Sequence, residues 1–210
     1  MNDGTHAVAR RELVDGLRDR LDVTGRTLSA LERVPRHEFV PARLRSSAYD
    51  DRPLPIGHDQ TISAPHMVAL MIDLLEVDEG DRVFEIGTGC GYHAAVIAEI
   101  VGSENVYSVE YVPALAASAR DRLERLGYPV TVRSGDGRDA FEDERPFDAA
   151  YLTCAAPDGV PDAIIDRVVD GGHVVAPVGD RTEQRLVRLT VRRDVVERED
   201  HGAVRFVPMQ

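Results

Sequence analysis

A glycine-rich turn followed by an acidic residue is the arrangement in this sequence best suited to chemistry. Residues 85–92 read Glu-Ile-Gly-Thr-Gly-Cys-Gly-Tyr, and Glu110 closes the apolar run that follows, at 106–109. Glycine has no Cβ, so such a turn can be tight and its backbone can approach a ligand closely. An acid at the end of the next strand lies beside the ribose of a nucleoside held over the turn. The pattern predicts a site for a nucleoside-containing cofactor.

The spacing of the glycines favours S-adenosylmethionine over a dinucleotide. Gly87, Gly89 and Gly91 follow G-x-G-x-G, whereas dinucleotide dehydrogenases usually carry G-x-G-x-x-G. Glu85 opens the motif, and we expect its carboxylate to receive the ammonium group of the cofactor through hydrogen bonds. The alternative interpretation of the motif is a tight packing turn that binds nothing.

A second motif supports the nucleoside site. Gly135-Asp136-Gly137 follows the third predicted strand of the cofactor fold, at the carboxyl edge of the sheet where ligands of such folds collect. Asp136 can accept a hydrogen bond from an adenine amino group, with Gly137 completing the turn. In isolation Gly-Asp-Gly is more often a plain turn, but its place after two earlier strand ends favours the binding role.

The elements that must position these residues alternate along the chain. We expect helices within the first 45 residues and at 67–75, separated by a structured loop at 47–66 that is neither helix nor strand. From residue 82 on, we expect strands at 82–86, 106–110, 130–133, 147–153, 173–178, 185–191 and 203–207, with helices at 92–101, 113–126 and 161–169. A short acidic turn joins the last two strand patterns and suggests an antiparallel hairpin.

This alternation predicts a doubly wound α/β fold. Because the glycine turn is typical of S-adenosylmethionine sites, we expect the fold to be of the Rossmann-like, S-adenosylmethionine-dependent methyltransferase type. We expect a mostly parallel seven-stranded sheet with an antiparallel edge and an N-terminal helical extension. The chain is interpreted as one domain, in which residues 1–80 supply the N-terminal helices and the active-site loop. Residues 81–210 form the Rossmann-like core.

Composition narrows the functional classes. The 210 residues, 43% of them hydrophobic, suffice for one domain with a sizeable core. We find no signal-peptide-like run and no stretch of membrane-spanning length, so we expect a cytoplasmic protein with no membrane partner. The two cysteines make neither a disulfide framework nor a four-ligand zinc site, and no histidine spacing matches a metal motif. We therefore expect no metal.

The charge balance argues against a nucleic-acid partner. Asp and Glu number 37 against 25 basic residues, giving a net charge of −12, and every basic residue is Arg. Phosphate binding needs a basic stripe, so we expect no nucleic acid. The acidic, lysine-free composition suits a salt-rich cytoplasm, where the screening length is about 3 Å at 1 M salt. Genomic GC bias also favours Arg over Lys, and the sequence leaves both explanations open.

The segment before the cofactor fold resembles a known family. Residues 53–67 read P-L-P-I-G-H-D-Q-T-I-S-A-P-H-M, close to the protein-L-isoaspartate O-methyltransferase signature P-L-P-I-G-x-G-Q-T-I-S-x-P-x-M. Further matching motifs follow the family's order over nearly the whole chain, at 34–41, 85–92, 135–137, 155–157, 171–172, 177–179 and 204–208. Asp59 departs from the family's usual glycine and adds a negative charge where an anionic substrate should lie.

The resemblance implies an enzyme that methylates the side-chain carboxylate of L-isoaspartyl residues in damaged proteins, which begins their repair. S-adenosylmethionine is the implied methyl donor, and Ser63 is the implied active-site serine. The implied cofactor contacts are Thr61, Ile62, Ser63, His66, Gly87, Glu110, Asp136 and Gly137. To these we add Gln60 from the loop, and Glu85, Gly89 and Gly91 from the glycine turn.

The chemistry agrees with this choice of residues. A carboxylate with a pKa of about 4 is already an ionised nucleophile at neutral pH, so no general base is required. We expect Ser63 to donate a hydrogen bond that orients the incoming carboxylate. The alternative is a purely structural role, in which the hydroxyl of Ser63 caps the following helix. In-line displacement at a sulfonium methyl depends mainly on holding two groups in line.

Two other functions stay open, and a third is excluded. The chain could be a methyltransferase acting on another carboxylate or a small molecule, although such enzymes usually lack the 60–67 loop. It could bind the cofactor without catalysis as an interaction module, but the sequence argues against this by retaining four residues suited to the reaction: Ser63, Glu85, Glu110 and Asp136. A dehydrogenase with a Ser/Thr-Tyr-x-x-x-Lys set is ruled out in a chain without Lys. We expect a monomer.

Overall fold

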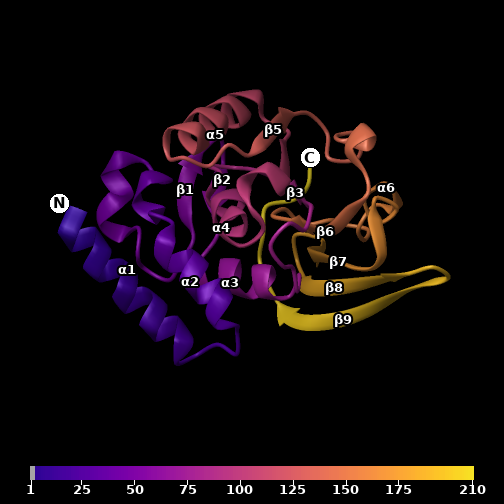
Figure 1. Ribbon diagram of the computed structural model, residues 1–210, viewed down its shortest axis with the longest axis horizontal. Helices are drawn as coiled ribbons and strands as arrows, with labels where there is room; N and C mark the ends of the chain where they lie inside the picture. The colour runs from indigo at the N-terminus through magenta and orange to yellow at the C-terminus, as the bar shows by residue number, and fades with distance from the viewer. Residues whose placement is uncertain (1–2) are drawn as a thin grey trace.

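The N-terminal helices lie at one end of a twisted sheet, and a long hairpin projects from the other end (Figure 1). The computed structural model describes residues 3–210. Helices α1 (Asp3–Arg18), α2 (Gly25–Arg33) and α3 (Pro65–Asp73) form the N-terminal part. Helix α2 begins at the N-cap Thr24, whose side chain accepts the backbone N–H of Thr27.

The main sheet has seven strands in the order β5-β4-β3-β6-β7-β8-β9. Neighbours from β5 through β7 pair in parallel, whereas β7–β8 and β8–β9 pair antiparallel. The strands are β3 (Val83–Ile86), β4 (Val106–Glu110), β5 (Thr131–Ser134), β6 (Phe147–Leu152), β7 (Val168–Gly179), β8 (Gln184–Arg192) and β9 (Val195–Ala203). The predicted mostly parallel sheet with an antiparallel edge is confirmed.

Three helices connect the strands of the core: α4 (Tyr92–Val101), α5 (Pro113–Arg125) and α6 (Asp162–Ile165). Helix α4 is buried along nearly its whole length, which explains why its sequence is apolar on every side. Short 3-10 turns complete the structure: η1 (Arg36–Glu38), η2 (Ala42–Ser47), η3 (Ser103–Asn105) and η4 (Glu142–Glu144).

The sheet buries both faces, as its central strands predict. Along β3, Val83 packs with α2, α3 and α4 in one hydrophobic core, whereas Phe84 and Ile86 point into a second core on the opposite face. In that second core the rings of Phe84 and Phe147 stack with centroids 5.3 Å apart. Strand β3 is therefore fixed from both sides, and its carboxyl end is a rigid platform.

The region predicted to be an irregular loop contains a small hairpin. Strand β1 (Leu54–Gly57) pairs antiparallel with β2 (Gln60–Ile62), so the expectation of no strand at 47–66 was wrong. The connecting residues His58 and Asp59 both have positive φ, at 51° and 57°, as in the two-residue turns that match strand twist. Proline is tolerated at the edge of a sheet, so Pro55 did not exclude a strand.

Two boundaries near the C-terminus also differ from the prediction. The helix expected at 161–169 ends at Ile165, because the β-branched pair Val168-Val169 already belongs to β7. The strand expected at 203–207 is instead β9, Val195–Ala203, which contains the acidic run predicted as a turn. Strand β9 lies at the open edge of the sheet and is exposed over most of its length, so charged residues are accommodated along it.

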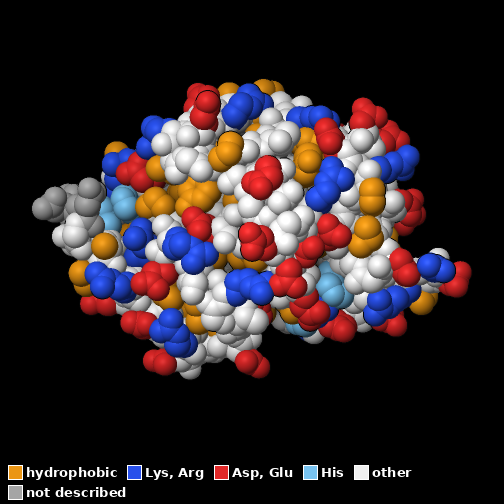
Figure 2. Space-filling model, viewed as in Figure 1, with side chains coloured by type: hydrophobic (Ala, Val, Ile, Leu, Met, Phe, Trp, Pro, Cys, Tyr) orange, Lys and Arg blue, Asp and Glu red, His pale blue; other side chains and the backbone are white. Residues whose placement is uncertain are grey.

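Side chains of both charges are interleaved on the face of the molecule seen in Figure 2. Figure 2 shows acidic groups spread over the visible face with arginines between them. Some of these arginines are paired; Glu38, for example, lies 3.2 Å from Arg45 and 3.3 Å from Arg125. Within residues 3–210 the helices are all too short or too polar to cross a bilayer.

Candidate active site

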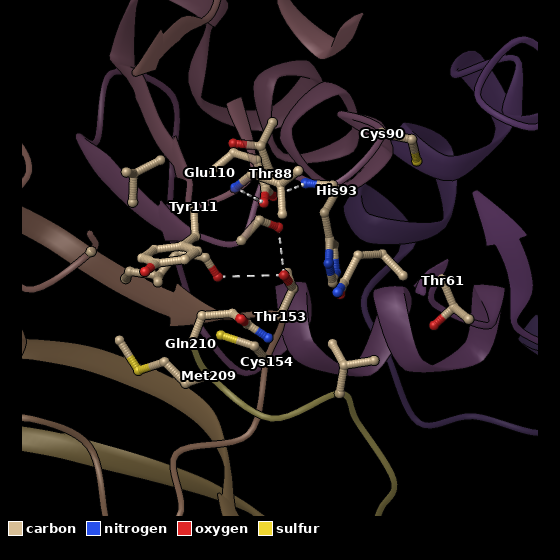
Figure 3. A pocket seen from close by; sticks show the side chains of 18 of the residues that line it. Thr61, Thr88, Cys90, His93, Glu110, Tyr111, Thr153, Cys154, Met209 and Gln210 are labelled. Carbon is tan, nitrogen blue, oxygen red and sulfur yellow. Dashed lines mark hydrogen bonds between the residues drawn. The ribbon is translucent and has the colours of Figure 1, made fainter. Parts of the chain in front are cut away.

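A pocket lies where four parallel strands end, the edge at which doubly wound sheets bind ligands (Figure 3). Segments that follow β3, β4, β5 and β6 form its floor, while the β1–β2 hairpin and the C-terminal segment add two further walls. The lining residues are 60–63, 86–90, 109–112, 135–137 and 207–210, together with Val68, Tyr92, His93, Thr153 and Cys154.

The glycine turn presents backbone rather than side chains to this pocket. Gly87 has φ of 100°, and a Cβ added there would overlap Oγ1 of Thr153. Gly89 has φ of 54°, and a Cβ there would meet Cδ1 of Ile56 in the hairpin at 3.4 Å. The turn is therefore in close contact with the hairpin and with Thr153, which follows β6, and a side chain at position 87 would have to displace Thr153.

Glu110 holds the glycine turn in shape while lining the pocket. Its Oε2 accepts the N–H of Gly89 at 2.8 Å, and its Oε1 accepts the N–H of Val112 at 2.9 Å. Each carboxylate oxygen can accept more than one hydrogen bond, so lone pairs stay available for a ligand hydroxyl. The residue predicted to bind a ribose thus lies on the pocket wall.

Asp136 and Gly137 form the wall beyond β5. The carboxylate of Asp136 accepts from Nε of Arg138 at 2.9 Å and from its backbone N–H at 2.8 Å. The side-chain hydrogen bond from Arg138 lowers the pKa of Asp136. A Cβ on Gly137 would lie 2.6 Å from Cγ2 of Ile86, so this turn packs closely against the end of β3. Asp136 therefore presents an ionised acceptor beside the pocket.

The segment at 60–63, which was predicted to contact the cofactor, lies next to the glycine turn. Gln60, Thr61, Ile62 and Ser63 all line the pocket. The neighbouring Ile56 lies against Gly89, as noted above. The loop and the turn, separated in sequence, thus face one common cavity. The functional roles assigned to these four residues stay predictions.

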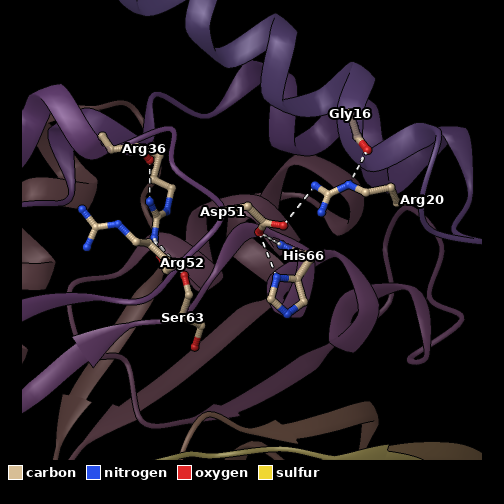
Figure 4. A network of polar contacts seen from close by, with 8 residues as sticks. Gly16, Arg20, Arg36, Asp51, Arg52, Ser63 and His66 are labelled. Carbon is tan, nitrogen blue, oxygen red and sulfur yellow. Dashed lines mark hydrogen bonds and ion pairs between the residues drawn. The ribbon is translucent and has the colours of Figure 1, made fainter.

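Two predicted residues lie just outside the lining. Gly91 is the N-cap of α4, with φ of 89°, and begins the helix behind the pocket. His66 is in the first turn of α3, where its Nδ1 and its backbone N–H both lie 2.9 Å from Oδ1 of Asp51 (Figure 4). Asp51 also accepts from Arg20 at 3.1 Å, so Asp51 links His66 in α3 to the turn that follows α1.

Glu85 does not reach the pocket, contrary to our expectation. It is fully buried beneath the glycine turn, where Ser108 and Tyr151 each donate a hydroxyl hydrogen bond to its carboxylate. Burial raises the pKa of Glu85 to about 7, against the opposing effect of the two hydroxyls. Neighbouring strands β4 and β6 supply these donors, so Glu85 joins three strands and is not among the residues that line the pocket.

The cofactor contacts assigned from the sequence leave out several residues that line the pocket. His93 follows Tyr92 in the first turn of α4, and its ring packs edge-on against Tyr151 with centroids 5.2 Å apart. Burial lowers the pKa of His93 to about 4, so its imidazole is neutral at pH 7, and Nε2 has no hydrogen-bond partner among residues 3–210. Its place two residues after Gly91 was the one available signal.

The C-terminal segment was also missed as part of the site. Residues 207–210 line the pocket because Met209 donates its N–H to the carbonyl of Ala155 at 2.8 Å. Further back, the side-chain amide of Gln184 binds Phe206 at both ends, accepting its N–H at 2.6 Å and donating to its carbonyl at 3.1 Å. The matching 204–208 motif was interpreted as a strand, which hid this role.

The donor set of the pocket fits an S-adenosyl group and offers no metal centre. Within residues 3–210 there is no cluster of three or more His, Cys, Asp or Glu side chains placed to hold a metal ion. The glycine cradle, the acceptors Glu110 and Asp136, and the apolar residues Ile62 and Val109 match a nucleoside with a polar tail.

Comparison with known proteins agrees with this geometry. The family model described as protein-L-isoaspartate(D-aspartate) O-methyltransferase matches residues 8–210. Protein-L-isoaspartate O-methyltransferase 2 of Archaeoglobus fulgidus is 48% identical over 203 residues, which cover 96% of this chain and 92% of that protein. Protein-L-isoaspartate O-methyltransferase 1 of the same organism is 50% identical over 202 residues, covering 95% and 92%.

Solved structures agree as well. A protein-L-isoaspartate O-methyltransferase superposes with a TM-score of 0.85 at 30% identity over 95% of this chain, which spans 65% of that longer chain. A Plasmodium falciparum protein solved in complex with S-adenosyl-L-homocysteine shares the fold, with a TM-score of 0.82 at 23% identity, covering 96% of this chain and 98% of that one. The chain therefore belongs to the protein-L-isoaspartate(D-aspartate) O-methyltransferase family.

Proposed function

We propose that this protein transfers a methyl group from S-adenosylmethionine to the side-chain carboxylate of L-isoaspartyl residues in damaged proteins, and so initiates their repair. The observation that carries the proposal is the shared pocket of the 60–63 segment and the glycine turn. Membership of the family and the names of its relatives support the same activity.

The bound cofactor supplies an electrophilic methyl group on a sulfonium. Glu110 accepts hydrogen bonds from the ribose hydroxyls of the cofactor, and Asp136 accepts a hydrogen bond from its adenine amino group. Thr61, Ile62 and the backbone of Gly87 and Gly89 enclose the remainder. We make these assignments because these residues line the pocket and because Glu110 and Asp136 carry acceptor oxygens.

Ser63 is the residue we assign to the acceptor. Its hydroxyl donates a hydrogen bond to one oxygen of the incoming carboxylate and leaves the other oxygen free to attack. The acceptor is already ionised at neutral pH, so no base has to remove a proton. His93 is neutral and lies in the wall, which keeps a second positive charge away from the sulfonium. Catalysis then comes from orientation.

The test compares paired peptides that differ only in Asp versus isoaspartate, incubated with radiolabelled S-adenosylmethionine at low and high salt. We expect base-labile label on the isoaspartyl peptide alone. Equal labelling of both peptides would favour a carboxyl methyltransferase of other specificity. Cofactor binding without transfer to either peptide would favour a binding module.

We further propose that the protein acts in the cytoplasm as a monomer and needs no metal, nucleic acid or membrane. The net charge of −12 and the interleaved acidic surface support the absence of a nucleic-acid partner. The same composition supports a salt-rich cytoplasm as its setting, an idea for which the salt dependence of unfolding is the test.

A further inference from the structure

One buried arginine, Arg36, ties the segment that carries Ser63 to the rest of the fold. Its side chain lies in η1 and is 0% exposed. One terminal nitrogen donates to the carbonyl of Ala48, and the other donates to the carbonyls of Arg52 at 3.2 Å and Ser63 at 2.9 Å (Figure 4). A single guanidinium thus donates hydrogen bonds to three backbone carbonyls between residues 48 and 63.

The same guanidinium lies against the cofactor side of the pocket. Its Cζ is 5.7 Å from the ring centroid of Tyr92, a lining residue that directly follows Gly91. Tyr92 is held in turn by an edge-on contact with Phe39, with centroids 5.5 Å apart. Arg36 therefore connects the wall that carries Ser63 with the wall that carries the glycine turn.

Folding stability alone does not account for an arginine at this place. Arg36 forms no ion pair within the described part of the chain, its Nε has no hydrogen-bond partner there, and burial lowers its pKa. A buried charge without a partner ion is costly, and apolar replacements are often neutral or stabilising. What arginine alone provides is several donors in one rigid plane.

We propose that Arg36 is a positioning residue for methyl transfer. By holding the carbonyl of Ser63 against the start of α4, it fixes the distance between the acceptor carboxylate and the methyl donor. The inference rests on the proposed function, in which Ser63 orients the acceptor. Misplacement by about 1 Å can cost about 10²-fold in rate, so the tether acts on turnover more than on cofactor affinity.

A double-mutant cycle tests whether Arg36 acts through Ser63. The variants are Arg36→Lys, which keeps the charge on one nitrogen that cannot reach three carbonyls, Ser63→Ala, and the pair together. We expect Arg36→Lys to lower kcat about 10-fold or more alone, and less than about twofold in the Ser63→Ala background. The Kd for S-adenosylhomocysteine, measured by calorimetry, should stay within about threefold of the parent.

A second readout needs no activity. Amide hydrogen exchange over residues 60–64 of the ligand-free protein should become faster in Arg36→Lys and stay unchanged in Arg43→Lys, a control at an exposed position in the neighbouring η2. Equal kcat effects in both backgrounds, a loss of S-adenosylhomocysteine affinity matching that of kcat, or unchanged exchange would overturn the proposal.

The two proposals fail differently. A parent protein that leaves isoaspartyl peptides unlabelled refutes the proposed function. The hydrogen-exchange measurement then tests by itself whether Arg36 holds the segment that carries Ser63. If Arg36→Lys does not fold, Arg36→Gln replaces it in both experiments. If neither variant folds, Arg36 is a requirement of folding and the specific positioning role is wrong.

Discussion

Oε2 of Glu110 accepts the backbone N–H of Gly89 at 2.8 Å, so the acid that ends β4 holds the turn that follows β3. The other oxygen accepts the N–H of Val112 at the start of α5. One carboxylate therefore organises two chain reversals before any ligand arrives. The two halves of the cofactor motif, far apart in sequence, are parts of one hydrogen-bonded unit.

Glu110→Gln tests that unit. The amide keeps one acceptor oxygen but replaces the other by an NH2 group, which cannot accept from a backbone N–H or a ribose hydroxyl. Losing hydrogen bonds to a charged group costs about 1.5–3 kcal/mol, so the Kd for S-adenosylhomocysteine should rise about 10- to 100-fold. Calorimetry measures it, with the exposed Glu104→Gln as control; equal affinities in both variants would contradict the role.

Gly87→Ala probes the close approach of the glycine turn to β6. The new Cβ would overlap Oγ1 of Thr153 at a φ of 100° that side chains rarely adopt. We expect a loss of about 3 kcal/mol or more in the free energy of unfolding, together with weaker cofactor binding. Urea unfolding and calorimetry measure the two effects.

Gly80→Ala is the matched control for this change. Gly80 also has positive φ, at 91°, but nothing lies within 4 Å of an added Cβ, so the variant reports backbone strain without overlap. Its cost should be about 1–2 kcal/mol. Adding Thr153→Ala to Gly87→Ala should recover part of the loss. If the glycine variants cost the same, steric overlap is not the reason for glycine at 87.

How far the sequence predicted this site depends on whether the signal was local. Glycine spacing and apolar alternation are local, so the turn, β3 and α4 were predicted nearly at their observed positions. The environment of Glu85 is not local, because its donors Ser108 and Tyr151 belong to neighbouring strands. An acid at the end of a strand suggested a carboxylate that reaches the pocket. Only the packing of the sheet shows that the carboxylate of Glu85 is buried.

The same distinction explains the other differences. The acidic run at 197–200 indicated a turn, since the pattern alone does not reveal that β9 has no neighbour on its outer side. The tie from Arg36 to Ser63 spans separate segments of the chain, and neither residue's sequence context points to the other. Pairwise contacts between distant elements are what a single sequence leaves undetermined.

Glu85→Gln should change how stability depends on pH. The pKa of Glu85 is raised to about 7 in the folded protein, above its ordinary unfolded value, so between those two values the folded state binds the extra proton. Its contribution is fully present below the unfolded pKa and is lost as pH rises towards 7. The difference in unfolding free energy, parent minus variant, should fall by at most about 1.4 kcal/mol per pH unit between pH 5 and 7.

Urea unfolding at each pH measures this difference. Other groups that titrate in the same range, such as His93 with its lowered pKa, are present in both proteins and cancel to first order. Glu104→Gln, at an exposed position, is the control variant measured over the same range. A flat difference for Glu85→Gln would show that the buried carboxyl titrates at its ordinary pKa.

Asp59 separates a backbone effect from a charge effect at the tip of the β1–β2 hairpin. With φ of 57°, the position favours glycine, so Asp59→Gly should raise the free energy of unfolding by up to about 1 kcal/mol. Asp59→Asn keeps a residue that tolerates this φ and should leave stability unchanged. Both variants remove a negative charge, and both should lower KM for an anionic isoaspartyl peptide at low salt.

At high salt that KM difference should vanish, because exposed charges are screened. Steady-state kinetics in dilute buffer and in concentrated KCl distinguish the two effects. A KM that falls in Asp59→Gly but not in Asp59→Asn would assign the effect to the backbone of the turn and not to its charge.

The acidic, lysine-free surface predicts that salt stabilises the protein. With a net charge of −12, like-charge repulsion acts across the surface in dilute buffer, where the screening length is about 10 Å at 0.1 M and falls to about 3 Å at 1 M. The free energy of unfolding, from urea titrations at pH 7, should therefore rise steadily with KCl. Glu79 and Glu104 are exposed and surround one hollow together with Glu99. Replacing both by Lys removes negative charge from this cluster, so Glu79→Lys with Glu104→Lys should reduce the slope of unfolding free energy against KCl concentration. Undiminished stability in dilute buffer would contradict adaptation to salt and leave genomic GC bias as the reason for a chain whose every cation is Arg.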